Sequence, residues 1–400
     1  MPIYKDLWAW TFALSITGYP LIGIASAFSD NESLSPAFRA AVLALSVLCF
    51  IFVDRKRDFR FGSVALLGFA GLYLAKLWID LEYGIDGADD AMLFVLITAV
   101  APAILLAAAT PKWSEINVAL AIFTISALAV AAILWLDYTG ADVLTRDPSD
   151  RIQLEKLNAI SIGHTAVTAL IASYVLLRST RRTSARVGIV LVVIASLYTV
   201  YFAGARGPVM SLAACLVLFP VLKPKAMTAI WCMVLAAASI LALALTDITP
   251  LLEKFNLATM DGNRSALERL DSISMSWSLF AENPWFGYGT QLPFWLYPHN
   301  LFMEVLQAVG IVGMAVFCVV LVQMYSAVKL FADLRLSLLP LLTTQFFVGA
   351  QFSGSIYGSG SLWIITTVLL FRANAIRNGI RQPISYWHGL GSRSASIRGT

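Results

Sequence analysis

About twelve apolar runs, each close to the length of a membrane crossing, divide this chain of 400 residues. A helix needs about 20 apolar residues to cross roughly 30 Å of hydrocarbon. With 59% hydrophobic and only 13% charged residues, a water-soluble globule would expose large apolar patches. A membrane barrel would show short alternating segments instead. The sequence therefore predicts an all-α polytopic membrane protein with about 12 transmembrane helices.

The charged loops predict which side of the membrane each helix end faces. Asp54–Arg60 and Arg178–Arg186 are dense in positive charge, which is typical of cytoplasmic loops. Asp80–Asp90 carries five acids and no base, so we expect it on the opposite side. Basic and acidic loops then alternate consistently along the chain, and both termini are predicted to be cytoplasmic.

The predicted organisation has four parts. Residues 1–245 form transmembrane helices 1–9, residues 246–298 form a large outer loop, residues 299–372 form helices 10–12, and residues 373–400 form a basic cytoplasmic tail. The first apolar run, Leu7–Phe28, is long enough to span the membrane and lacks a small-residue cleavage pattern. We therefore expect it to be retained as the first helix.

The large outer loop carries most of the candidate chemistry. Arg264 and Arg269 lie in a pattern that resembles a capped helix start, with Glu268 in the first turn. The run through Trp277 and Phe280 has the spacing of an amphipathic helix on the membrane face. An arginine paired with Glu268 in solvent is one interpretation. A two-donor phosphate contact is the sharper one for Arg269, because an unpaired charge within an apolar pattern is unfavourable.

Arg206 lies in a tight turn between two predicted helices at the outer face, in the sequence Gly204-Ala205-Arg206-Gly207-Pro208. An arginine at such a boundary can simply reach toward lipid phosphate. The glycines and the proline also make a rigid mount, on which an anion could approach backbone and guanidinium together. The turn therefore indicates a phosphate-binding position.

His299 follows a proline and opens the tenth predicted helix. A histidine there can cap a helix, or it can take a proton from an attacking hydroxyl because its ordinary pKa is near neutral. Asn300 beside it could orient a substrate. His164 lies within an apolar helix, where we expect an interhelical hydrogen bond.

The acidic outer segment offers an alternative chemistry. A divalent-metal site of a lipid-phosphate glycosyltransferase could draw its ligands from Asp80, Glu82, Asp86, Asp89 and Asp90. Such spacing is weak evidence, and a solvated outer loop explains these acids better. We therefore predict that no metal and no other cofactor takes part.

Four features together resemble the bacterial O-antigen ligase and O-antigen polymerase superfamily. They are the Gly-Ala-Arg206-Gly turn, Ser265-x-x-x-Arg269, the segment Glu282–Gly289, and His299-Asn300 followed by Gly310-x-x-Gly313. The resemblance implies a GT-C-like fold of about twelve helices, with a large periplasmic loop carrying short helices, in the bacterial inner membrane. It also implies glycan transfer from an undecaprenyl-pyrophosphate carrier, and for ligases a sugar hydroxyl of lipid A-core as acceptor.

The resemblance further implies that transfer is metal-independent and uses a histidine and arginines, which here are His299, Arg206 and Arg269. The residue chemistry agrees, since a sugar pyrophosphate needs cationic stabilisation more than an acid, and a hydroxyl acceptor needs a base. Arg264 is a less certain third cation. With no carboxylate placed as a nucleophile, we expect a single inverting displacement. The expected partners are the donor, the acceptor and membrane lipid, with no nucleic acid.

Three other functions remain open from the sequence. An O-antigen polymerase and a protein O-oligosaccharyltransferase would carry the same loop motifs. A transporter or flippase of a lipid-linked glycan would also need arginines on the outer side, together with polar cavities at mid-membrane depth and helices broken in matched halves.

Overall fold

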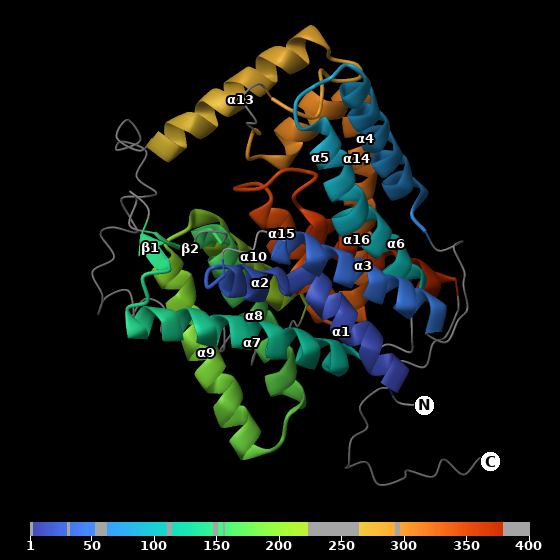
Figure 1. Ribbon diagram of the computed structural model, residues 1–400. Helices are drawn as coiled ribbons and strands as arrows, with labels where there is room; N and C mark the ends of the chain where they lie inside the picture. Colours follow the sequence, from blue (N-terminus) through green and yellow to red (C-terminus); the bar gives the residue numbers. More distant parts are fainter. Residues whose placement is uncertain are drawn as a thin grey trace, which may run out of the picture.

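The computed structural model describes residues 3–29, 33–52, 62–109, 114–146, 151–154, 157–222, 264–292 and 297–378, and the account below concerns these residues. The predicted ninth helix, the first part of the large loop and most of the basic tail lie outside them. The described chain is almost entirely helical (Figure 1).

The helices follow one another along the chain as α1 (Ile3–Thr17), α2 (Tyr19–Ser26), α3 (Leu34–Phe52), α4 (Val64–Glu82), α5 (Ala88–Val95), the π-helix η2 (Leu96–Val100), α6 (Ala101–Ala108), α7 (Glu115–Thr139), α8 (Ala159–Ser179), α9 (Thr183–Ala203), α10 (Arg206–Leu222), α13 (Arg264–Glu282), α14 (Leu301–Asp333), α15 (Leu338–Gly349) and α16 (Gly360–Arg377). Seven helical spans are long and apolar enough to cross a membrane, and the bent pair α1 and α2 would make an eighth. The protein is therefore multi-pass, as predicted. The count of twelve and the GT-C-like arrangement stay predictions.

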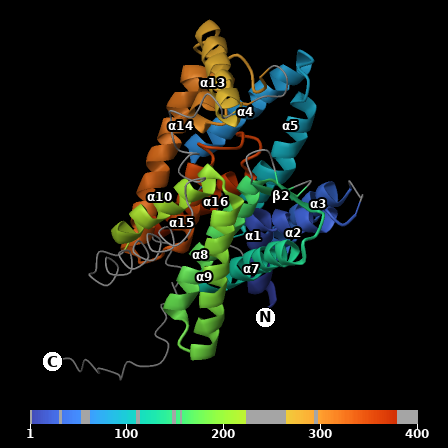
Figure 2. The same ribbon diagram turned by 90° about the vertical axis from the view of Figure 1, so that its left-hand side faces the viewer.

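The two views place α13 and the α8–α9 turn at opposite ends of the molecule (Figures 1 and 2). The turn carries the basic segment Arg178–Arg186, and α13 belongs to the large loop that was predicted to lie on the other side. The structure thus separates the two segments in space, and the side of the membrane that each one faces stays a prediction. Helix α13 itself spans the predicted amphipathic run and ends just before Asn283-Pro284.

The predicted first helix is broken. Helices α1 and α2 meet at Gly18 with a bend of 59°. Pro20 is in the first turn of α2, where its missing N–H removes no helical hydrogen bond but would remove one from a continuous helix. A Cβ atom added to Gly18 would lie 2.8 Å from the Phe38 ring, so the break also lets α3 approach closely. The prediction of one continuous helix was wrong here.

A small hairpin lies between α7 and α8, where only a polar loop was predicted. Strands β1 (Leu144–Arg146) and β2 (Ile152–Leu154) pair in antiparallel register, with Thr145 opposite Gln153. Ile152 and Leu154 are buried in one hydrophobic cluster with Ala203 at the end of α9. This packing fixes the residue before β2, Arg151, to the part of the fold that carries the Arg206 turn.

Helix α14 is interrupted at Gly310, whose φ is +65°. The segment before α14 docks into this break: the N–H of Ile311 donates to the Pro284 carbonyl at 2.8 Å, and the N–H of Val312 donates to the Trp285 carbonyl at 3.2 Å. A Cβ atom on Gly310 would lie 2.4 Å from the Trp285 oxygen. The tenth span was predicted as unbroken. The loop segment replaces part of its helical hydrogen bonding, which the apolar pattern does not reveal.

Candidate functional site

The turn around Arg206 is as tight as the sequence predicted. Helix α9 ends at Ala203, Gly204 adopts a left-handed conformation with φ +59°, and α10 begins at Arg206. A Cβ atom on Gly163 of α8 would lie only 2.6 Å from the Pro208 ring, so α8 packs closely against the first turn of α10. The backbone therefore holds Arg206 in a defined position at the turn between α9 and α10, against which α8 packs.

Three arginines from separate parts of the chain share one electrostatic neighbourhood. Burial lowers the pKa of Arg206, and the charge of Arg151 lowers it further. Burial also lowers the pKa of Arg269, followed by the charges of Arg151 and Arg206. Because such like-charge effects fall off with distance, the three guanidinium groups are close enough to repel one another. A bound anion would relieve that repulsion.

Arg206 and Arg269 were predicted from the sequence as phosphate-binding residues, whereas Arg151 was not. Arg151 stood in a long polar segment with no motif around it, and only the packing of β2 brings it to Arg206 and Arg269. The available signal was the position of Arg151 directly before Ile152-Gln153-Leu154, a short run in which apolar and polar residues alternate as they do in a strand. Arg264 begins α13, but its side chain lies outside the described residues, so its proposed role stays a prediction.

Tyr297 connects the arginines to His299. Its ring centroid lies 4.2 Å from that of His299. Burial raises the pKa of Tyr297, as do Tyr357 and Glu304, while the charge of Arg269 acts in the opposite direction. Tyr297 is therefore a neutral phenol within electrostatic reach of Arg269, and its ring packs against the histidine ring at a tilted angle.

His299 has an unusual backbone conformation. Its φ is +52°, a left-handed value that non-glycine residues rarely adopt. The next residue, Asn300, caps α14, because its Oδ1 accepts a hydrogen bond from the N–H of Met303 at 3.1 Å. The substrate-orienting role of Asn300 stays a prediction, and the structure gives its side-chain oxygen a capping role that the sequence analysis did not assign.

Glu304, one turn into α14, is a buried acid that sequence reasoning did not single out. Its two carboxylate oxygens accept from the N–H of Ile356 at 2.8 and 2.9 Å. The Trp363 indole donates to the carbonyl of the same residue at 2.8 Å. These contacts fasten the connection between α15 and α16 to α14, close to His299.

The acidic outer segment is exposed to solvent, as expected, at Glu82, Asp86, Asp89 and Asp90, but not at Asp80. Asp80 is only 4% exposed and accepts hydrogen bonds from Thr290, whereas Glu82 is exposed. Gln307 of α14 donates to the carbonyl of Gly289 at 3.0 Å. Asp80 therefore helps to hold the segment that precedes His299 against α4 and α14, and the expectation of a solvated loop was wrong for this residue.

Within the described ranges, no group of three or more His, Cys, Asp or Glu side chains is arranged to hold a metal ion. Asp80 and Glu82, the first two candidate ligands, differ in placement, since one is buried against Thr290 and the other is exposed. The predicted independence of metal stays a prediction.

His164 lies beside the Arg206 turn. A Cβ atom on Gly349 of α15 would be 2.5 Å from its ring, and its Nε2 is 3.7 Å from the corresponding position on Gly207. The interhelical hydrogen bond expected of His164 is made by its backbone carbonyl, which accepts from Gln345 at 2.8 Å. The imidazole Nδ1 has no hydrogen-bond partner in the part of the chain that the structure describes.

The sequence that carries this site was compared with known protein families and with curated proteins. The model of the O-antigen ligase family matches residues 191–318, a range that contains Arg206, Arg269 and His299. A search of curated proteins found no match. Residues 191–318 are thus similar to the O-antigen ligase family, and this match supports the membership of the chain in the O-antigen ligase/polymerase superfamily.

Proposed function

We propose that this protein is an O-antigen ligase, which transfers a glycan from undecaprenyl-pyrophosphate to a sugar hydroxyl of lipid A-core in lipopolysaccharide biosynthesis. In this proposal it acts in the bacterial inner membrane, with the site at the periplasmic face and both termini in the cytoplasm. The family match supports a glycosyltransferase role. The single observation that carries the proposal is the gathering of Arg151, Arg206 and Arg269 next to the closely packed rings of Tyr297 and His299.

The arginine cluster suits the donor. A pyrophosphate carries several negative charges, and planar guanidinium groups bind phosphate oxygens with two parallel hydrogen bonds. When the bond between the anomeric carbon and the pyrophosphate oxygen breaks, the leaving group gains charge. Fixed cations that are already in place stabilise that charge without reorganisation. Arg206 and Arg269 are assigned to the pyrophosphate, Arg151 joins them, and Arg264 is a further candidate.

His299 suits the acceptor. As a neutral imidazole it takes the proton of the attacking sugar hydroxyl, while that oxygen forms the new bond to the anomeric carbon and the undecaprenyl pyrophosphate departs. Its left-handed backbone is the kind of outlier that is concentrated at functional sites. Asp80 and Glu304 are both engaged by backbone N–H groups, so neither is assigned as a nucleophile, and a single displacement inverts the anomeric centre.

Reconstitution tests this function. Purified protein in vesicles is given a pyrophosphate-linked glycan donor and lipid A-core, with and without excess chelator. We expect glycan to appear on lipid A-core in both conditions, because the arginines supply the positive charge that a divalent cation would otherwise supply to the leaving pyrophosphate. Activity that vanishes with chelator and returns with metal would contradict the metal-independent mechanism alone.

The same assay separates the rival functions. Elongation of carrier-linked glycan without transfer to lipid A-core would indicate a polymerase, and transfer to an added protein acceptor would indicate an O-oligosaccharyltransferase. Movement of the donor across the vesicle without a new glycosidic bond would indicate a transporter. Any of these three results in place of lipid A-core glycosylation contradicts the ligase proposal.

A further inference from the structure

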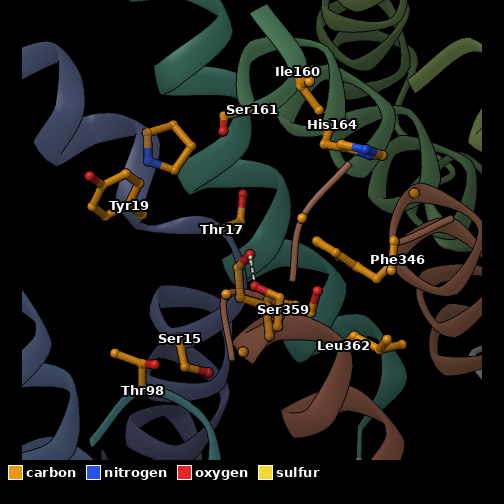
Figure 3. Close-up of a pocket in the computed structure, with 18 of the residues that line it drawn as sticks. Ser15, Thr17, Tyr19, Thr98, Ile160, Ser161, His164, Phe346, Ser359 and Leu362 are labelled. Carbon is orange, nitrogen blue, oxygen red and sulfur yellow. Dashed lines mark hydrogen bonds between the residues drawn. The ribbon is translucent and has the colours of Figure 1, made fainter. Parts of the chain in front are cut away.

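Figure 3 shows a cavity of about 440 Å³ enclosed by several helices. Tyr297 is part of its wall, and the Tyr297 ring also packs against the His299 ring at a tilted angle. The volume falls within the range of small-molecule sites, about 300–1,000 Å³. The cavity is therefore large enough for a ligand group and adjoins the residues assigned to glycan transfer.

Three interruptions of the helical backbone meet at this cavity. They are the break between α1 and α2 at Gly18, the π-helix η2 with Ile97 and Thr98, and the connection from α15 to α16 that ends at Ser359. A π-helix within an α-helix is often found at a functional site. In a membrane protein, irregular backbone is tolerated where protein covers it or where it lines a polar cavity.

Two buried polar atoms of the lining, the Thr17 hydroxyl oxygen and the His164 Nδ1, have no hydrogen-bond partner in the described part of the chain. Thr17 is 3% exposed, and its Oγ1 has no hydrogen-bond partner among the described residues. Figure 3 shows the hydroxyls of Thr17 and Ser161 facing the same space, with Tyr19 and His164 at its sides. A buried hydroxyl without a partner is unfavourable by about 1–3 kcal/mol, so the Thr17 hydroxyl favours a polar ligand in the cavity.

The lining also favours negative charge. The first residues of α2 and α16, Tyr19 and Gly360, form part of the wall, and neither helix has a side-chain cap. Uncapped helix N-termini present N–H groups and partial positive charge. Arg39 adds a full charge, with its guanidinium 4.3 Å from the centre of the Phe94 ring.

We propose that this cavity binds a sugar unit that carries an anionic group, either on the donor glycan or on the acceptor. The inference rests on the proposed glycan transfer for the identity of the substrates. Hydroxyl partners and aromatic faces suit a sugar ring, and Arg39 with the two helix N-termini suits a phosphate or carboxylate on that ring. A polyprenyl tail would leave the Thr17 hydroxyl unsatisfied, and a bare phosphate would not use the aromatic walls.

Direct binding tests the cavity without any transfer reaction. The thermal unfolding midpoint of detergent-purified protein is measured against the concentration of glucose 6-phosphate, glucose or inorganic phosphate, and apparent Kd values are derived. We expect glucose 6-phosphate to bind the wild type at least about tenfold more tightly than either glucose or phosphate. Equal affinity for phosphate alone, or no stabilisation by glucose 6-phosphate, would overturn the proposal.

Matched variants locate the binding. Thr17→Val should weaken glucose 6-phosphate binding about two- to tenfold, and Arg39→Gln about tenfold or more. Thr343→Val is the control for the first, because Thr343 is also buried with no partner among the described residues but does not line the cavity. Arg186→Gln, on the exposed α8–α9 turn, is the control for the second. Equal Kd values in Thr17→Val, Arg39→Gln and both controls would overturn the assignment.

Transfer kinetics then identify the source of the sugar. In the reconstituted assay, Arg39→Gln should raise the KM for one substrate about tenfold while kcat stays near the wild-type value. A higher donor KM assigns the cavity to the donor glycan, and a higher acceptor KM assigns it to the acceptor. Unchanged KM for both substrates contradicts the proposal. If the wild type makes no glycosidic bond, the proposed function fails, and the binding measurements still decide the cavity.

Discussion

The carboxylate of Asp80 accepts two hydrogen bonds from Thr290, one from its backbone N–H and one from its hydroxyl, both at 2.6 Å. The two residues are 210 positions apart in the chain, and their contact joins the end of α4 to the segment that leads into His299. Lys76, one turn earlier in α4, adds a 3.0 Å bond to the Gly287 carbonyl. Helix α4 is thus a support for the candidate site.

Asp80→Asn should lower the free energy of unfolding by about 1–3 kcal/mol, because an amide cannot replace the charge that two buried donors face. Thermal unfolding in detergent measures this, and transfer activity should fall as well. Glu82→Gln is the matched control, since Glu82 is an exposed acid of the same segment and its change should stay within about 0.5 kcal/mol. Equal stability of the two variants would show that Asp80 is not a support.

Gly310→Ala should destabilise the protein by about 1–3 kcal/mol, because an alanine would be strained at φ +65° and its Cβ would clash with the Trp285 carbonyl. Gly71→Ala is the control, since a Cβ at that helical position in α4 meets nothing within 4 Å. The unfolding midpoints of the two variants provide the measurement. An unchanged midpoint in Gly310→Ala would mean that the loop does not depend on this break.

His299→Ala should reduce transfer by roughly 10²–10⁴-fold while donor binding is retained, as the loss of a general base requires. His299→Asn makes the test sharper, because asparagine tolerates the left-handed conformation but cannot accept the proton. Single-turnover rates and donor Kd are measured for both. Near wild-type turnover in the asparagine variant would remove the assigned role, whatever happens to the alanine variant.

Arg206→Lys should fail to restore the activity lost in Arg206→Ala, because a point charge cannot reproduce a planar two-donor contact with phosphate. The comparison is made on kcat/KM for the donor. Arg186→Lys should retain wild-type kinetics, since this exposed arginine donates to the Thr180 carbonyl at the opposite end of α9. Full activity of Arg206→Lys would mean that Arg206 contributes only its positive charge and makes no specific two-donor contact with the phosphate.

Arg151→Ala should raise the donor KM by about 10–100-fold, the loss expected for one charge-assisted hydrogen bond to phosphate. Its effect should shrink at high salt if Arg151 acts only at long range, and persist if it contacts the donor. Donor KM at two ionic strengths distinguishes the cases, with Arg186→Ala as the control. A donor KM equal to that of the wild type at low salt would exclude Arg151 from the site.

Local sequence signals predicted several parts of the site. The Arg206 turn followed from glycine and proline, and α13 followed from its apolar spacing and from the Asn283-Pro284 stop. They could not predict Arg151, because nothing near it in the sequence is distinctive. The same signals wrongly predicted that Asp80 is exposed to solvent, because a cluster of acids in a loop is usually exposed. Its buried partner Thr290 is distant in the sequence and could not be recognised from it.

The apolar runs by themselves determined that this chain crosses a membrane many times, because hydrocarbon accepts a backbone only when a helix satisfies its own hydrogen bonds. The tertiary structure decided what happens where those helices stop. Phe38 packs at the break at Gly18, and Trp285 packs at the break at Gly310, although both residues are distant from these glycines in the sequence. Hydropathy is a sum over neighbours in sequence, whereas the site and the cavity are made by contacts between segments that lie far apart.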